Sequence, residues 1–180
     1  MRIVSGKNKG RRITAPGNLP VRPTTDMAKE ALFNILNNDY YFDQIAVLDL
    51  FSGIGSISLE FASRGTSDIV SVDSYPGCVN FLEKINTELQ NSIETIRSDA
   101  FVFLEKSNRA FDVIFADPPY DFEVEKLQKI VNLIFDRGLL LPGGTLIIEH
   151  GRKTDLSMLQ NFDRVRKYGG NLFSFFSIKE

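Results

Sequence analysis

The central part of the sequence alternates short apolar runs with longer amphipathic stretches, and this alternation most restricts the fold. Buried strands are expected at 46–51, 69–73, 93–97, 111–116 and, after 139–141 and a Pro-Gly-Gly turn, 145–149. Helices are expected between them at 57–64, 77–90, 100–106 and 122–136. Repeated strand–helix units predict a parallel sheet with helices on both faces.

Both ends of the chain depart from this alternation. Segments 3–5 and 12–14 flank a Gly-Lys-Asn-Lys-Gly turn, which predicts a small basic hairpin. Thr24 or Thr25 can then cap a helix that runs to about Leu36. Segments 163–168 and 172–178 surround a Gly-Gly-Asn turn, which predicts a closing antiparallel hairpin. We expect a single domain over residues 1–180, with a basic hairpin extension at 1–25 and a helix plus α/β core at 26–180.

The composition excludes several classes of protein. One Cys and one His disfavour an internal disulfide and a zinc centre, so no metal site is predicted. No apolar run reaches membrane-spanning length, and the mostly polar and basic residues 1–13 do not resemble a signal peptide, so we expect a cytoplasmic protein. The first 30 residues carry seven Lys or Arg against two Asp or Glu, although the whole chain has a net charge of −2. A basic arm fits contact with phosphate, and a solvated, poorly ordered terminus is the alternative.

A glycine loop, Asp-Leu-Phe-Ser-Gly-Ile-Gly over 49–55, follows the first expected strand and leads into a helix. A dinucleotide-binding loop would have a third glycine where this chain has Ser58, and no Walker lysine follows, which disfavours ATP. Asp49 would repel a pyrophosphate but could accept from the ammonium group of an amino acid. Ser52, Gly53 and Gly55 would let a ligand approach the backbone closely.

Two further acids follow the next two expected strands. Asp73 could accept from both hydroxyls of a ribose, and Asp99 could accept from an adenine amino group. Acids at three successive strand ends fit a nucleoside that carries a positively charged amino acid. The sequence therefore predicts S-adenosylmethionine as cofactor.

The fourth expected strand ends in Asp117-Pro118-Pro119-Tyr120. Two prolines cannot continue a sheet ladder, so the chain turns sharply there. Asp117 and the carbonyl of Pro118 could accept the two N–H groups of an exocyclic amine, and Tyr120 could stack on a flat base. A plain Pro-Pro turn with a buried Tyr is the alternative interpretation. We expect His150 to be a structural residue rather than a catalytic base. Cys78 is expected to be an ordinary helix residue.

These motifs together resemble the bacterial 16S ribosomal RNA guanine-966 N2-methyltransferases. The matching segments are 22–26 (Arg-Pro-Thr-Thr-Asp), 30–36, 48–55, 63–65, 111–112, 116–120 and 149–150. The resemblance implies a Rossmann-like class I methyltransferase fold, with a mostly parallel seven-stranded sheet whose last strand is antiparallel. It also implies S-adenosylmethionine as methyl donor and a ribosomal substrate. The chain departs from the family at Ser52, usually alanine or similar, and at 74–76, usually a more charged tract.

The expected reaction is methyl transfer to the 2-amino group of a guanine in 16S rRNA, within the 30S subunit or a late assembly particle and without an obligate protein partner. Asp117 and Pro118 would hold the amine, and Tyr120 would stack on the base. Asp117 would also lie beside the methyl donor. Arg11, Arg12 and Arg22 are the candidates for contact with RNA phosphate. Two alternatives remain: a DNA adenine or cytosine amino-methyltransferase, and a non-catalytic RNA-binding protein on the same fold.

Overall fold

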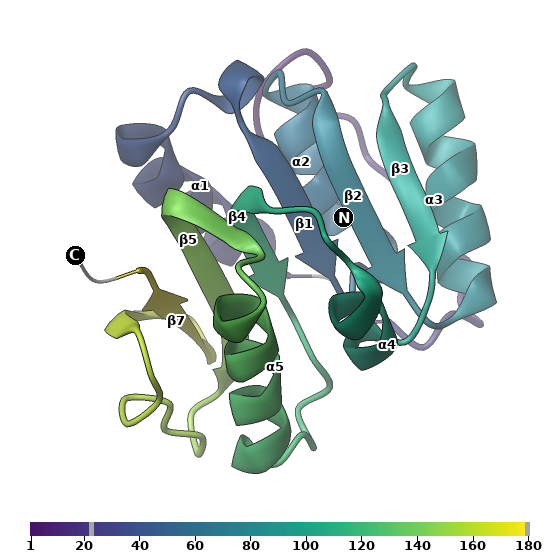
Figure 1. Cartoon of the computed structure of the whole chain (residues 1–180). Coiled ribbons are helices and arrows are strands. Elements are labelled where there is room, and N and C mark those ends of the chain that lie inside the picture. Colours follow the sequence, from purple (N-terminus) through teal and green to yellow (C-terminus); the bar gives the residue numbers. More distant parts are fainter. Residues whose placement is uncertain (22–23, 179–180) are drawn as a thin grey trace.

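A computed structural model describes residues 1–21 and 24–178, which form a sheet with helices on both faces (Figure 1). The strands are β1 (Ala46–Leu50), β2 (Asp68–Asp73), β3 (Ile93–Arg97), β4 (Phe111–Ala116), β5 (Leu140–Gly151), β6 (Phe162–Tyr168) and β7 (Asn171–Phe176). The helices are α1 (Asp26–Asp39), α2 (Ser56–Ser63), α3 (Pro76–Glu88), α4 (Ala100–Lys106) and α5 (Val124–Asp136), and a short 3-10 helix, η1 (Phe42–Gln44), precedes β1.

The seven strands have the order β3-β2-β1-β4-β5-β7-β6. Strands β1 to β5 pair in parallel, whereas β7 pairs antiparallel with both β5 and β6. The tight turn between β6 and β7 makes this reversal possible, since Gly169 adopts a positive φ of 60°. The predicted Rossmann-like methyltransferase sheet, with its antiparallel last strand, is confirmed.

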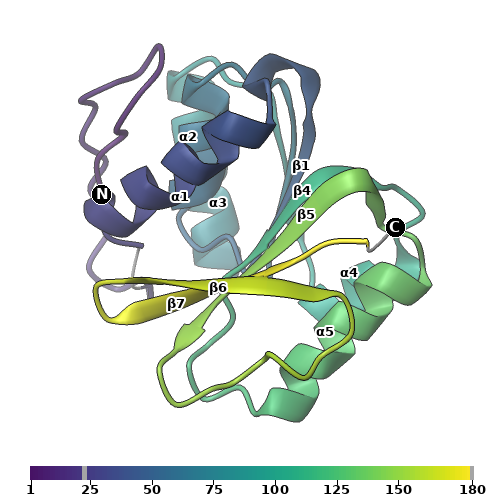
Figure 2. The ribbon, with the colours of Figure 1, turned by 90° about the vertical axis from the view of Figure 1, so that its left-hand side faces the viewer.

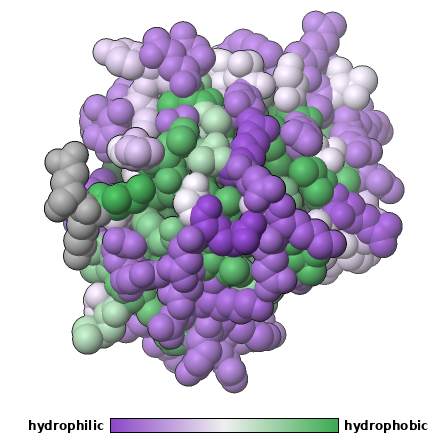
Figure 3. All heavy atoms as spheres, in the orientation of Figure 1, coloured by the Kyte–Doolittle hydropathy of each residue, from purple (hydrophilic) through white to green (hydrophobic). Residues whose placement is uncertain are grey.

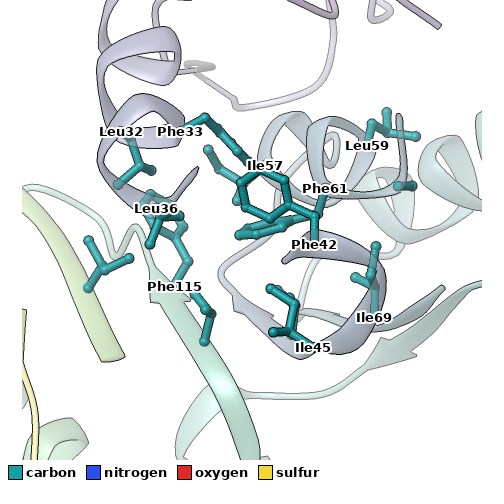
Figure 4. Packing of buried hydrophobic residues seen from close by; sticks show 14 of the residues in the cluster. Leu32, Phe33, Leu36, Phe42, Ile45, Ile57, Leu59, Phe61, Ile69 and Phe115 are labelled. Atoms are coloured by element: carbon teal, nitrogen blue, oxygen red, sulfur yellow. The ribbon is translucent and has the colours of Figure 1, made fainter. Parts of the chain in front are cut away.

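Helices α1, α2 and α3 cover one face of the sheet, and α4 and α5 cover the other (Figure 2). Each face has its own apolar core. On the first face, side chains of α1, η1 and α2 meet in a cluster of aromatic rings formed by Phe33, Phe42 and Phe61 (Figure 4). This cluster fixes α1 and α2 relative to each other, and both helices reach the edge of the sheet where the strands β1 to β4 end.

Most expected elements have the predicted bounds to within two or three residues. The largest difference is in β5, where Pro142, Gly143 and Gly144 lie within one continuous strand rather than in a turn. A shift in the β4–β5 register between Phe111 and Val113 accommodates this segment as an irregularity of the ladder.

The N-terminal arm, residues 1–13, forms the predicted small hairpin and lies against α2. Its strands are short: Arg2 and Arg12 form an antiparallel bridge, and the backbone N–H groups of Ile3 and Gly10 donate to the carbonyls of Arg11 and Ile3 at 3.0 and 2.9 Å. The hairpin also bonds to α2: Ser63 Oγ donates to the carbonyl of Ser5, and the backbone N–H of Lys7 donates to the carbonyl of Ser63 (2.7 Å). The arm is therefore a docked segment, and the alternative of a poorly ordered terminus is wrong.

The surface that carries α4 and α5 mixes hydrophilic residues with smaller hydrophobic areas (Figure 3). Within residues 1–21 and 24–178, no helix combines the length and the apolar character needed to cross a membrane.

Candidate active site

A cavity of about 330 Å³ opens at the edge of the sheet where β1, β2 and β4 end. Its wall includes the glycine loop, the first turn of α2, the segment before α1 and the turn after β4. The residues that line it are Pro20, Val21, Thr24, Asp49, Phe51, Ser52, Gly53, Ile54, Ser56, Ile57, Asp73, Ser74, Tyr75, Cys78, Phe115, Asp117, Pro118, Pro119 and Tyr120. The cavity thus brings together the predicted catalytic residues and all but two of the predicted cofactor residues, the exceptions being Gly55 and Asp99.

Glycines shape the loop between β1 and α2 in two different ways. Gly53 has a φ of 53°, and a Cβ built there meets no atom closer than Val21 Cγ1 at 3.5 Å, on the cavity side. Gly55 has a φ of 80°, and a Cβ built there would lie 2.4 Å from Leu82 Cδ1 of α3. Gly53 therefore leaves the cavity open, while Gly55 allows α2 to pack closely on α3.

Asp49 lies on β1 at the floor of the cavity and is buried. Its Oδ2 accepts from the backbone N–H of Ser58 (3.1 Å) and from Ser58 Oγ (2.6 Å), and Ser58 Oγ also bonds to Ser71. Burial and, to a lesser extent, the negative charge of Asp73 raise the pKa of Asp49 to about 7, although the hydrogen bonds from Ser58 act to lower it. A cationic group in the cavity would stabilise the charged form of Asp49.

Asp73 and Asp99 have different surroundings. Asp73 lines the cavity and holds the glycine loop, because its Oδ2 accepts from the backbone N–H of Gly53 and its Oδ1 from that of Tyr75, both at 2.8 Å. Asp99 caps α4 by accepting from the backbone N–H groups of Phe101 and Val102, and it does not line the cavity. Contact between Asp99 and an adenine stays a prediction.

The turn after β4 places an acid and an aromatic ring at the mouth of the cavity. Asp117 follows the last residue of β4, and its backbone N–H donates to the carbonyl of Leu50 (3.3 Å). Burial raises the pKa of Asp117 well above the usual aspartate value, and the charges of Glu149 and Asp49 raise it further. Pro118 is buried, whereas half of the Tyr120 surface is exposed. Tyr120 therefore presents a ring at the rim, contrary to a plain turn with a buried Tyr.

Glu149 and Lys29 are two further buried charged residues near the site. Glu149, at the end of β5, accepts from Thr24 Oγ1 (3.1 Å) and from Asn171 Nδ2. Lys29 of α1 is fully buried, and its Nζ donates to the carbonyl of Arg2 (2.6 Å) and lies 3.4 Å from Ser56 Oγ, in the first turn of α2. These contacts join residues far apart in the chain, so local sequence patterns carry no signal for them, although Glu149 lies in a segment of the family resemblance.

His150 and Cys78 are both buried near the site. His150 Nε2 bonds to Ser174 Oγ (2.7 Å) and its Nδ1 contacts the carbonyl of Gly151 (3.1 Å), while burial lowers its pKa. Burial and the charge of Asp73 raise the pKa of Cys78 in α3 to about 11. Both residues are held as neutral packing groups at neutral pH.

The predicted RNA-contact residues Arg11 and Arg12 are exposed on the arm. The backbone of Arg12 forms a β-bridge with that of Arg2. The side chain of Arg2 forms an ion pair with Asp26 at the start of α1, with Nε 3.1 Å from Oδ2. Arg22 lies outside the residues that the structure describes.

The family model described as "Conserved hypothetical protein 95" matches residues 1–177. This chain belongs to that family. The Bacillus subtilis protein YlbH is 35% identical over 161 residues, which cover 87% of this chain and 85% of YlbH. The Escherichia coli K12 protein named "Ribosomal RNA small subunit methyltransferase D" is 30% identical over 150 residues, which cover 83% of this chain and 74% of the relative. The resemblance inferred from the sequence motifs is confirmed.

A solved structure of a Thermus thermophilus protein has the same fold. It superposes with a TM-score of 0.85 and 26% sequence identity, and the alignment covers 99% of each chain. The arm and the β6–β7 hairpin therefore belong to the shared fold along with the central sheet.

Proposed function

We propose that this protein transfers a methyl group from S-adenosylmethionine to the 2-amino group of a guanine in 16S rRNA. The observation that carries this proposal is a single cavity lined by both the glycine loop and the Asp117-Pro118-Pro119-Tyr120 turn. One part is suited to a nucleoside with a cationic amino acid, and the other to a flat base with an exocyclic amine. Family membership supports rRNA as the substrate.

The cavity residues fit the methyl donor. Asp49 would pair with the ammonium group of its amino acid, and Asp73 would accept from its ribose hydroxyls while holding Gly53 in place. Gly53 leaves room for the ligand, since a Cβ at this position would project toward the cavity. When bound, S-adenosylmethionine supplies the methyl group and, as a sulfonium, a neutral leaving group.

The turn after β4 would position the acceptor amine. Asp117 and the carbonyl of Pro118 accept its two N–H bonds, which holds the nitrogen in line with the methyl carbon. Such positioning contributes on the order of 7–11 kcal/mol to lowering a barrier. As the new N–C bond forms, the amine loses a proton, and the raised pKa of Asp117 makes its carboxylate a suitable acceptor. Tyr120 stacks on the base, which is worth roughly 1–3 kcal/mol.

Arg11 and Arg12 would contact RNA phosphate beside this site. The bridge to Arg2, and the ion pair of Arg2 with Asp26, tie this part of the arm to the start of α1. Thr24, two residues before α1, lines the cavity. Phosphate contacts there would orient an RNA strand whose flipped base enters the site. The substrate is the 30S subunit or a late assembly particle, which places the reaction in the cytoplasm.

Incubation with labelled donor and 30S particles, naked 16S rRNA or duplex DNA, followed by mapping of the label, tests this proposal. We expect label on one guanine amine of 16S rRNA, with the highest yield on the assembled particle. Label only on DNA would overturn the ribosomal substrate and favour the DNA amino-methyltransferase. Donor binding in calorimetry without label on any nucleic acid would overturn both hypotheses.

A further inference from the structure

A second groove, of about 230 Å³, adjoins the cavity at Tyr120, which lines both of them. It is bounded by the start of α1, the end of β5 and the β6–β7 turn. The residues that line it are Thr25, Met27, Ala28, Tyr120, Glu149, Tyr168, Gly169, Gly170 and Asn171. Tyr120 lines both hollows, and the groove shares none of the glycine-loop residues. A base that stacks on Tyr120 with its amine at Asp117 can therefore occupy the groove while the donor occupies the cavity.

Glu149 lies beside Asp117 in this arrangement. Strands β4 and β5 are parallel, with Ala116, the last residue of β4, opposite Ile148, so Asp117 and Glu149 are the residues that follow this pair. The two carboxyl groups are close enough for the charge of Glu149 to raise the pKa of Asp117. The groove and the cavity thus meet at a pair of acidic side chains.

The carboxylate of Glu149 is buried and held in one orientation. Thr24 Oγ1 donates to Glu149 Oε2 and Asn171 Nδ2 donates to Glu149 Oε1, from opposite ends of the chain. An ionised carboxylate has about four acceptor positions, so it can accept from a ligand as well as from the groups that orient it. Such preorganisation is typical of a side chain that binds a ligand, rather than of one that only packs against its neighbours.

The base-pairing edge of guanine carries two neighbouring donors, the N2 amine and N1–H, followed by the O6 acceptor. Adenine and cytosine instead carry an unprotonated ring nitrogen beside the amine. Two adjacent carboxylates complement the guanine edge, because Asp117 accepts from the amine and the second acid accepts from N1–H. The same second acid would face the lone pair of the ring nitrogen of adenine or cytosine, which is repulsive.

We propose that the groove receives the acceptor base and that Glu149 selects guanine by accepting a hydrogen bond from N1–H. Glu149 is in this role a specificity-determining residue that contacts the substrate. The inference rests on the proposed function, since it names the group that distinguishes guanine from the other bases with an exocyclic amine.

The first test uses the unaltered protein. 30S particles are reconstituted with 16S rRNA that carries either guanosine or 2-aminopurine riboside at the acceptor position, the latter keeping the 2-amino group but lacking N1–H and O6. We expect methyl transfer to 2-aminopurine to be about 10- to 100-fold less efficient, the scale of leaving a buried acceptor without its donor. Equal efficiency would overturn the role of Glu149 and leave the proposed function intact. Failure to methylate the guanosine particle would instead overturn the proposed function and this inference with it.

The second test is Glu149→Gln, whose amide can donate to an unprotonated N1. We expect transfer to guanosine to fall about 10- to 100-fold and the guanosine preference to shrink to about threefold or less, because 2-aminopurine gains a donor. A ratio that stays at the value of the unaltered protein would overturn the inference. Calorimetry of S-adenosylmethionine binding shows that the variant is folded. Glu125→Gln, an exposed acid in the first turn of α5, is the matched control and should keep both rates.

Discussion

Glu60 on α2 and Asp49 on β1 are both buried carboxylates, but they have different partners. Glu60 accepts from the backbone N–H groups of Val4 and Ser5 at 2.8 and 3.0 Å and forms ion pairs with Lys29 and Arg64. Within residues 1–21 and 24–178, no Lys or Arg forms an ion pair with Asp49, and its carboxylate accepts hydrogen bonds from Ser58.

This difference distinguishes an acid that is paired within the protein from one that a ligand in the cavity could pair with. The charge of Glu60 is compensated inside the protein, where it fixes the arm to α1 and α2. Asp49 and Asp117 have pKa values raised by burial, so each is more readily charged once a ligand supplies a cation or a donor. Perturbed acids in a cavity are typical of functional sites, whereas an ion-paired acid beneath an arm is typical of a packing contact.

On the arm side of this comparison, Lys29→Met should have the largest effect on stability. It removes one of the two cations that pair with the buried Glu60, while Arg64 stays in place, so the loss should approach but not exceed that of a fully broken buried pair, about 3–5 kcal/mol. Urea unfolding measures the loss. Lys84→Met, which removes an exposed lysine that pairs with Glu88, is the matched control and should cost less than about 1 kcal/mol. Equal losses in the two variants would show that the ion pair beneath the arm is not structural.

On the cavity side, Asp73→Ala should weaken donor binding by about 1.5–3 kcal/mol, the scale of hydrogen bonds to a charged acceptor. The variant loses both the ribose contact and the bond that holds Gly53. Calorimetric titration with S-adenosylmethionine measures the change. Asp68→Ala, at the exposed start of the same strand, should bind normally, and unchanged binding by Asp73→Ala would limit Asp73 to a structural role.

The raised pKa of Asp49 makes a prediction about pH. The folded protein holds this proton up to about pH 7, whereas the unfolded chain releases it near the ordinary aspartate pKa of 3.8. The ligand-free protein should therefore lose stability as the pH rises from about 4 to 7, by at most about 1.4 kcal/mol per pH unit from this group. Asp49→Asn should flatten that slope in urea unfolding at about pH 5 and about pH 8. An unchanged slope would mean that Asp49 is already charged in the folded protein.

The smallest effect is expected on the exposed face of the arm. Replacing Arg11 and Arg12 with Glu should reduce the slope of log affinity for RNA against log salt by about one for each lost phosphate contact. Donor binding should stay the same, because neither side chain lines the cavity. Lys106→Glu, at the end of α4 on the opposite face of the sheet, is the control and should keep the slope. Loss of donor binding in the arm variant would mean that the arm shapes the cavity.

The fold could be predicted from the sequence because β1, β2, β4 and the second half of β5 are short, mostly apolar runs that alternate with amphipathic helical stretches. The closing hairpin followed from its Gly-Gly-Asn turn. The docking of the arm could not be predicted in the same way, because it depends on Lys29 and Glu60, which meet only after α1 and α2 have packed.

The clustering of the candidate residues was predictable where one short motif carries several polar groups. Asp49, near the end of β1, and the turn at Asp117, after β4, meet at one edge of the sheet, as a parallel sheet requires. The role of Asp99 was less predictable, because an acid between a strand and a helix can equally cap the helix, as Asp99 caps α4. Glu149 of β5 bonds to Thr24, before α1, and to Asn171, at the β6–β7 turn, and only the tertiary structure brings these residues together.

The most direct test of this account is Asp117→Ala, measured both for methyl transfer to 30S particles and for urea unfolding. Transfer should fall by at least about 10²- to 10⁴-fold, the scale of a lost acid–base and positioning group. The free energy of unfolding should stay the same or rise, because burial disfavours the charged Asp117, and donor affinity should change by no more than a few-fold. Near-normal transfer, or a loss of stability as large as that of Lys29→Met, would contradict the assignment of Asp117 as the residue that holds the acceptor amine.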